Sequence, residues 1–168
     1  MIPSLIIAIS IILDGVLSNF LPYTVNALSL FTPMLTVVSI FIIYPFYTKK
    51  EKYYYLTAII TGVIYDLFYT NMLFYNAVIF LILAIITKYI NKNFEVNYLN
   101  IIIQILIIIS SYEIINACII IVFNLVPMSF YRLLYKISHS LLLNIIYSEI
   151  LLLILNKLPK KYKKININ

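Results

Sequence analysis

Long apolar runs separated by short polar connections dominate the chain. The runs long enough to form helices lie at about residues 2–20, 28–47, 53–69, 72–90, 99–123 and 137–156. A helix of about 20 apolar residues spans the hydrocarbon core of a bilayer. The pattern therefore predicts an all-α integral membrane protein, with a bundle of six transmembrane helices in residues 1–156 and a basic tail in residues 157–168.

Polar residues inside the apolar runs recur at helical spacing. Ser10 and Asp14 are four residues apart, and Lys136, Ser140 and Asn144 continue the same interval in the last run. Residues three or four apart share one face of a helix, so each polar stripe must face the interior of the bundle. The rest of each helix surface, mostly Ile and Leu, is then left to contact acyl chains.

The run at residues 53–69 combines small residues with an acid. Ala58, Gly62 and Asp66 are four residues apart and share one helical face. The two small side chains let a neighbouring helix approach closely, and the carboxylate then points into that contact. Because an unpaired carboxylate is costly in lipid, we expect a partner for Asp66 inside the protein. A structural role is favoured, with an ion or proton site as the alternative.

The charged residues indicate topology. The 168-residue chain is 64% hydrophobic and 11% charged, which excludes a soluble globular domain. Lysines such as Lys49, Lys92 and Lys157 follow the second, fourth and sixth runs. The positive-inside rule places these ends, and both termini, in the cytoplasm. Because the cations sit at the ends of apolar segments and not along one polar face, the net charge of +6 does not indicate nucleic-acid binding.

Arg132 and Lys136 depart from this rule, since they lie in the third outer connection. We hypothesise that they reach inward and pair with one or more of three intramembrane acids, Asp14, Asp66 and Glu113. Such pairing would close the outer end of the bundle electrostatically. For Glu113, near the middle of its run, a structural and a functional role both stay open.

Motifs of enzymes and metal sites are missing from the sequence. There is no HExxH, GxSxG or P-loop pattern, and one His and one Cys offer no recognisable triad. We therefore expect a protein that is not an enzyme and needs no metal or other cofactor. Cys118 lies within an apolar run and is interpreted as a small core residue.

Four short motifs occur in a defined order along nearly the whole chain. They are Pro33-Met34-Leu35, Gly62-Val-Ile-Tyr-Asp66, Glu113, and Lys136 followed by Leu142-Leu143-Asn144. Together they resemble the bacterial rod shape-determining protein MreD family. The chain departs from the family at Phe74 and His139, where a glycine and a proline are common.

The resemblance implies a non-enzymatic membrane scaffold of the cell-elongation (rod) complex in the bacterial plasma membrane, which helps regulate peptidoglycan synthesis and cell shape. The implied partners are MreC, and MreB, RodA and a class B penicillin-binding protein directly or through MreC. Membrane lipids are expected as partners of the lysine-rich tail, and a homo-oligomer stays open. The resemblance also implies residues that stabilise the fold or contact a partner, and these are Gly62, Asp66, Glu113 and Asn144.

Two other functions stay open. The family's fold resembles the substrate-binding membrane subunits of energy-coupling-factor transporters, which makes a vitamin-binding subunit the main alternative. A bundle that conducts protons or ions through Asp14, Asp66 and Glu113 is the weaker one.

Overall fold

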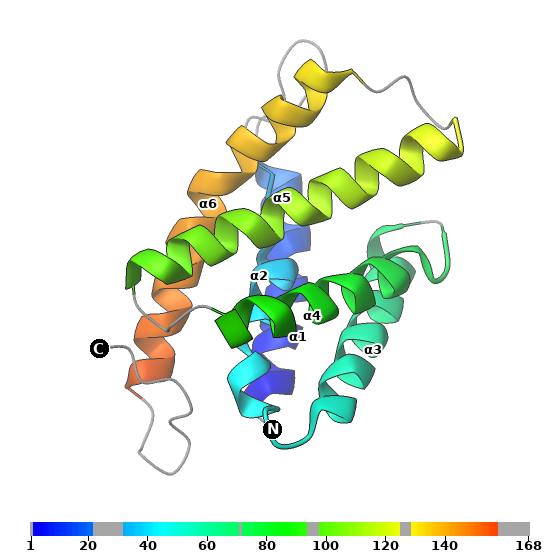
Figure 1. Ribbon diagram of the computed structural model, residues 1–168. Coiled ribbons are helices and arrows are strands. Elements are labelled where there is room, and N and C mark those ends of the chain that lie inside the picture. The colour runs from blue at the N-terminus through cyan, green and yellow to red at the C-terminus, as the bar shows by residue number, and fades with distance from the viewer. Residues whose placement is uncertain (1, 22–31, 71, 94–97, 125–128, 158–168) are drawn as a thin grey trace.

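The computed structural model describes residues 2–21, 32–70, 72–93, 98–124 and 129–157, and Figure 1 shows their arrangement. No strand occurs in these ranges. The elements are helices α1 (Ile2–Phe20), α2 (Leu35–Ile42), α3 (Glu51–Tyr69), α4 (Tyr75–Asn93), α5 (Tyr98–Val122) and α6 (Phe130–Asn156), with a short 3-10 turn, η1 (Tyr44–Phe46), after α2. The predicted tail, apart from Lys157, lies outside the described residues.

Four of the helices, α1, α4, α5 and α6, are long and apolar enough to cross a membrane. Helix α2 has only eight residues, or about 12 Å at about 1.5 Å per residue, and cannot span a bilayer alone. Helix α3 is as long as α1 but carries Glu51, Lys52 and Asp66. The all-α fold is thus confirmed in the described residues, where four helices, not six, have the length and composition of a membrane span.

Residues 28–31 of the second predicted helix, residues 28–47, lie outside the described residues, and the rest of that prediction is wrong in its bounds. Residues 32–34 are not helical, and α2 begins only at Leu35. Pro33 explains this, because a proline ring disfavours the helical conformation in the residue before it and donates no backbone hydrogen bond. Helix α6 starts at Phe130, before the predicted residue 137, where the Ser129 hydroxyl accepts a hydrogen bond from the Arg132 N–H at 3.3 Å.

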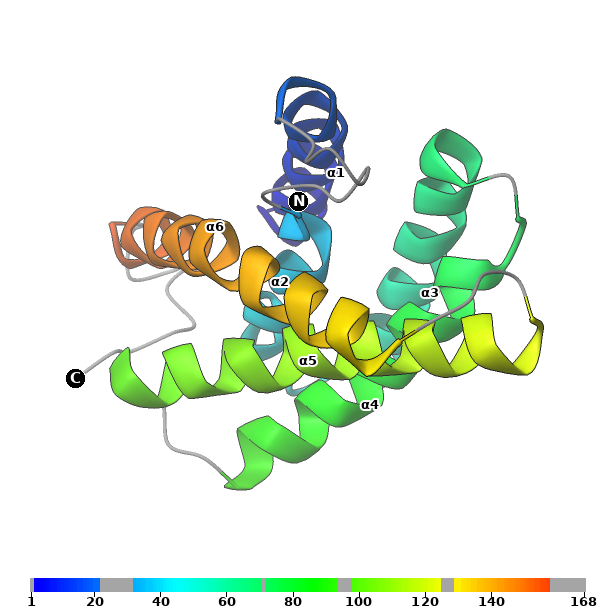
Figure 2. The ribbon, with the colours of Figure 1, turned by 90° about the horizontal axis from the view of Figure 1, so that it is seen from above.

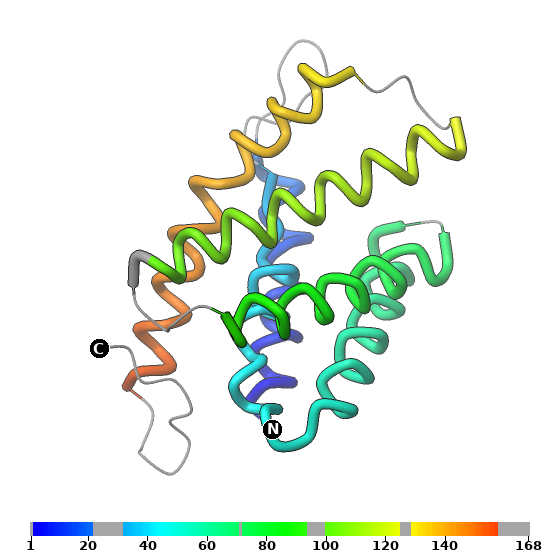
Figure 3. Tube along the Cα trace, in the orientation of Figure 1, coloured from blue at the N-terminus to red at the C-terminus, as the bar shows by residue number. Residues whose placement is uncertain are grey.

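The short helix α2 lies at the centre of the bundle. It contacts α1, α4, α5 and α6, and all its residues are buried. Figure 2 shows α5 passing beneath α2, while α1 and α6 flank α2 on other sides. Helices α3 and α4 fold back on each other as a hairpin, which the trace in Figure 3 follows. The apolar core lies between these elements, with Ile40, Ile79 and Ile109 at most 1% exposed.

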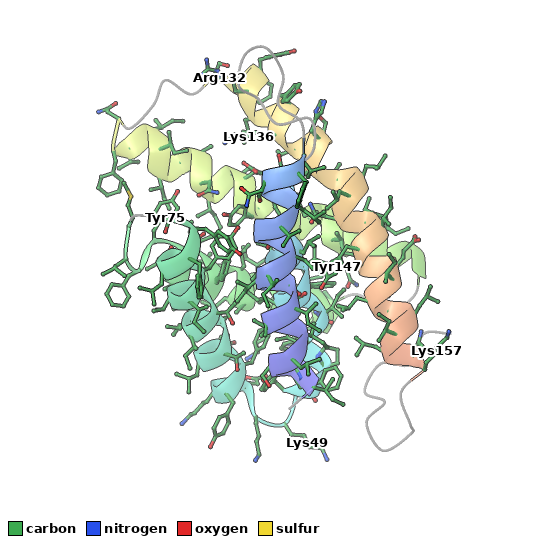
Figure 4. The ribbon with its side chains drawn as sticks, turned by 180° about the vertical axis from the view of Figure 1, so that it is seen from behind. Lys49, Tyr75, Arg132, Lys136, Tyr147 and Lys157 are labelled. Carbon is green, nitrogen blue, oxygen red and sulfur yellow. The ribbon has the colours of Figure 1, made fainter. Side chains whose placement is uncertain are left out.

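The outer surface is apolar, as expected for helices in lipid. Large side chains such as Ile12, Leu67 and Leu153 are more than half exposed. Cys118 is also exposed, so the interpretation of this residue as part of the core is wrong. The cations lie at the two ends: Arg132 and Lys136 at one, Lys49 and Lys157 at the other (Figure 4). The positive-inside rule accounts for Lys49 and Lys157 at one end, and Arg132 and Lys136 at the other end remain the exception to it.

Candidate functional site

Asp14 of α1 caps the N-terminus of α2. Its carboxylate accepts hydrogen bonds from the backbone N–H of Leu35 at 2.7 Å and of Thr36 at 2.9 Å, and from the Thr36 hydroxyl at 2.6 Å. The first N–H groups of a helix have no partner within the helix, and the helix dipole makes that end favourable for a negative charge. Asp14, which is 2% exposed, therefore lets a helix begin inside the bundle.

Asn144 of α6 supports the non-helical residues before α2. Its side-chain oxygen accepts from the Met34 N–H at 2.9 Å, and its amide nitrogen donates to the Thr32 carbonyl at 3.0 Å. Unpaired backbone groups buried at this depth would each cost about 1–3 kcal/mol. The amide side chain can satisfy one donor and one acceptor at once. Asn144 therefore pairs the backbone groups just before α2, as Asp14 pairs those at its first residues.

Asp66 of α3 performs the same task for α4. The carboxylate accepts from the backbone N–H of Asn76 at 3.0 Å, from the Asn76 amide at 2.8 Å and from the Thr70 hydroxyl at 2.7 Å. Asp66 is fully buried. The partner expected for this acid inside the protein is thus the start of the next helix.

Gly62 permits the close contact that brings Asp66 to α4. A Cβ placed on Gly62 would overlap with the backbone of Asn76 and Ala77, so no side chain fits there. Ala58, one turn away, is also buried. The predicted small-residue face of α3 is confirmed as the surface on which α4 packs.

The proposed pairing of the acids with Arg132 and Lys136 is wrong for Asp14 and Asp66. Both carboxylates bind helix N-termini and neighbouring polar side chains instead of cations. Within the described ranges, the ion pair that does form is Lys88–Glu51 at 2.7 Å, which joins the start of α3 to the end of α4.

Glu113 of α5 differs from the other two acids. It is 3% exposed, and its Oε2 atom has no hydrogen-bond partner among the described residues. It borders a cavity of about 200 Å³ at the end of the bundle that carries Arg132. The cavity is lined by Asp14, Thr32, Pro33, Met34, Val37, Tyr65, Tyr112, Glu113, Asn116 and Lys136. The structure thus brings Glu113 and Lys136 to one cavity without forming an ion pair between them.

Three hydroxyl groups join α1, α2 and α6 near the middle of the bundle. The Ser10 Oγ lies 2.5 Å from the Ser39 Oγ and 2.6 Å from the Tyr147 hydroxyl, which Figure 4 labels. Both serines are buried, as the polar stripe predicted for Ser10. Tyr147 was not singled out by the sequence, because one tyrosine among 16 in the chain carries no positional signal.

A second cavity is an apolar groove between α1 and α3, which stand apart in Figure 2. Its volume is about 470 Å³. Its lining residues are Ser4, Ile7, Ala8, Ile11, Ile12, Tyr47, Thr57, Ile60, Thr61, Ile64 and Phe68. Next to it, the Tyr69 hydroxyl of α3 donates to the Ile11 carbonyl at 2.6 Å and so ties α3 to α1.

No group of three or more His, Cys, Asp and Glu side chains in the described ranges is placed to hold a metal ion. Comparison with protein families then gives one clear result. The sequence matches the family of rod shape-determining protein MreD over residues 1–162. The chain belongs to the MreD family. No curated protein and no solved structure matches it, so the likeness to transporter subunits stays a prediction.

The motifs that indicated MreD have concrete structural roles in this chain. Pro33-Met34-Leu35 forms the break at which α2 begins, and Asn144 holds that break. Gly62 and Asp66 join α3 to α4. Phe74, where the family commonly has glycine, has a φ of 68°, in the left-handed region that favours glycine.

Proposed function

We propose that this MreD-family protein is a non-enzymatic scaffold that holds MreC in the rod complex and so helps regulate peptidoglycan synthesis. Membership of the family assigns a role in rod-shape determination. The protein would reside in the plasma membrane as a multi-pass protein with both termini in the cytoplasm. Lys49 and Lys157 lie at one end of the bundle and support this orientation, from which Arg132 and Lys136 at the opposite end depart.

The observation that carries the scaffold role is the apolar groove between α1 and α3. Ile7 and Ile11 on α1 face Ile60 and Ile64 on α3 across it, and each pair is four residues apart. Ser4 and Ala8 add a pair of small residues at the same interval on α1. Small residues in a membrane groove let a second helix approach closely, and association in lipid depends on such close packing.

The occupant that fits this groove is a single apolar helix, such as a membrane anchor of MreC. The exposed Ile12, Ile60 and Phe68 of the groove would face lipid in a bilayer, so an occupant would reach it without passing through water. Its few polar groups, including Thr57 and Thr61, already donate hydrogen bonds to carbonyls within α3. Shape and apolar contact would therefore supply most of the affinity.

Co-purification of MreC with variants of this chain tests the proposal. Ala8→Trp fills the groove and is expected to reduce the amount of MreC recovered at least fivefold. Ile121→Trp places the same bulk on an exposed position of α5 and serves as the matched control. In a Cys118→Ser background, Ile60→Cys should form cross-links to single cysteines in the membrane anchor of MreC, and Ile121→Cys should not.

Recovery of MreC with Ala8→Trp at the level of the control would contradict this use of the groove. Recovery of paired ATPases and a coupling subunit, or of a bound vitamin, in place of MreC would favour the transporter alternative. Each variant is first checked for wild-type thermal stability, so that loss of MreC reports binding and not unfolding.

A further inference from the structure

The polar cavity beside Glu113 has no role in the scaffold proposal. Its lining shares no residue with the α1–α3 groove and comes from α1, α3, α5, α6 and the residues around the start of α2. At about 200 Å³ it is much larger than the roughly 10–15 Å³ that one water requires. It is smaller than the roughly 300–1,000 Å³ of sites for drug-sized ligands. Its size therefore suits a compound of few atoms or a head group.

Two side chains of opposite charge border this cavity without a direct bond between them. The Oε2 atom of Glu113 has no hydrogen-bond partner among the described residues, although the residue is only 3% exposed. Lys136, half-buried on α6, borders the same cavity, and no ion pair joins the two side chains. The third ionisable group, Asp14, is already engaged by the start of α2. One acceptor and one cation thus remain for a ligand.

The aromatic walls add a preference for a cation near Glu113. Tyr65 of α3 and Tyr112 of α5 border the cavity. The face of a tyrosine ring attracts an ammonium group, and a charge-assisted hydrogen bond to a carboxylate is about twice as strong as a neutral one. Lys136 offers the opposite charge nearer the surface, where Figure 4 places it on α6.

We propose that this cavity binds a small zwitterion, with its protonated primary amine on Glu113 and its phosphate or carboxylate on Lys136. The ligand has to carry both charges a few bonds apart to reach both side chains. Two sources offer this chemistry: the ethanolamine head group of a phospholipid and a free amino acid or amino-alcohol phosphate. The proposal does not depend on the scaffold role, because the two sites share no lining residue.

Binding to the purified full-length protein tests the site. The lipid arm uses native mass spectrometry of protein from nanodiscs that contain equal amounts of phosphatidylethanolamine, phosphatidylcholine and phosphatidylglycerol. The soluble arm titrates O-phosphoethanolamine and glycine, with phosphocholine as the analogue that cannot donate from its nitrogen. Wild-type protein should retain the ethanolamine form at least tenfold over the choline form in one of the two arms.

Two substitutions and their controls assign the charges. Glu113→Gln and Lys136→Met should each reduce binding about tenfold or more, the effect of losing one charge-assisted hydrogen bond. Glu149→Gln and Lys157→Met change the same residue types at exposed or less buried positions of α6 and its end, and should leave binding unchanged. If Glu113→Gln fails to fold, Lys136→Met and the choline comparison still decide the question.

The outcomes separate the sources and the alternatives. Selective binding in the lipid arm alone identifies a phospholipid head group, and selective binding in the soluble arm identifies a free zwitterion. Absence of binding in both arms, equal binding of choline and ethanolamine forms, or binding that survives both substitutions overturns the proposal and leaves a water-filled cavity.

Discussion

The helix pairs α1/α2 and α3/α4 are joined by the same type of hydrogen bond, across different lengths of intervening chain. In each pair, a buried aspartate on the first helix accepts hydrogen bonds from the N-terminus of the second. Asp66 reaches Asn76 across a tight hairpin that Gly62 makes possible, whereas Asp14 reaches Leu35 from farther along the chain. The second case also needs Asn144 from α6, because the backbone before α2 is not helical.

The pair α5/α6 has a buried acid but does not use it in this way. Helix α6 is capped by its own Ser129, and Glu113 binds no helix start. The burial of an acid in this bundle is explained where backbone N–H groups donate hydrogen bonds to its carboxylate. Asp14 and Asp66 are explained in this way, and Glu113 is left as the candidate for binding.

The largest expected effect comes from replacing Asp66, the fully buried carboxylate that accepts hydrogen bonds from the start of α4. Asp66→Asn puts an amide NH₂ against donors that require an acceptor. Because several buried donors then lose their partner, the free energy of unfolding should fall by about 3 kcal/mol or more. Unfolding in mixed micelles, followed by circular dichroism, measures this. An equal effect from Glu149→Gln, which is exposed, would contradict the role given to the buried carboxylate.

The two glycines sharpen the comparison between the pairs. Gly62→Ala should reduce the free energy of unfolding by about 2 kcal/mol, because the added methyl meets the rigid backbone of α4. Gly15→Ala is the comparison variant, since its methyl meets the side chain of Tyr69 and not backbone. Tyr69 must turn away and give up its hydrogen bond to the Ile11 carbonyl, so we expect a loss of about 1 kcal/mol, partly offset by the better helix propensity of alanine. Equal losses in the two variants would contradict the close approach of α3 and α4.

The smallest expected effect is an increase in stability, at Phe74. Phe74 holds a φ of 68° before α4, and its side chain is 62% exposed. Phe74→Gly should raise the free energy of unfolding by about 1 kcal/mol, because glycine adopts this conformation without steric cost. The thermal midpoint in detergent measures the change. A lower midpoint would mean that the contacts of the phenyl ring outweigh the strain.

Much of this fold could be predicted from spacing alone. The burial of Asp14 and Asn144 and the packing face of Ala58, Gly62 and Asp66 follow from a helical interval of four, because lipid penalises any other orientation. The break at residues 32–34 was not predicted, although Pro33 marks it, because the surrounding run is as apolar as a continuous span.

The partners of the acids could not be predicted in the same way. The pairing hypothesis relied on charge, which favours Arg132 and Lys136. Within a bundle the N–H groups at the start of a helix compete with cations as partners of a carboxylate, and no side-chain pattern reports where they lie. The cavity beside Glu113 and the unpartnered Oε2 atom depend on how helices distant in the sequence pack together. They could therefore be found only in the structure of the described residues.

Asp14 and Asp66 hold the fold of this bundle, whereas Glu113 does not. The free energy of unfolding of Asp14→Asn, Asp66→Asn and Glu113→Gln, measured in the same mixed micelles, tests this difference. We expect a large loss for the first two and a value for Glu113→Gln equal to or above that of the wild type, because a buried carboxylate that no helix N-terminus stabilises is replaced by a neutral amide. A loss with Glu113→Gln as large as that with Asp66→Asn would contradict it.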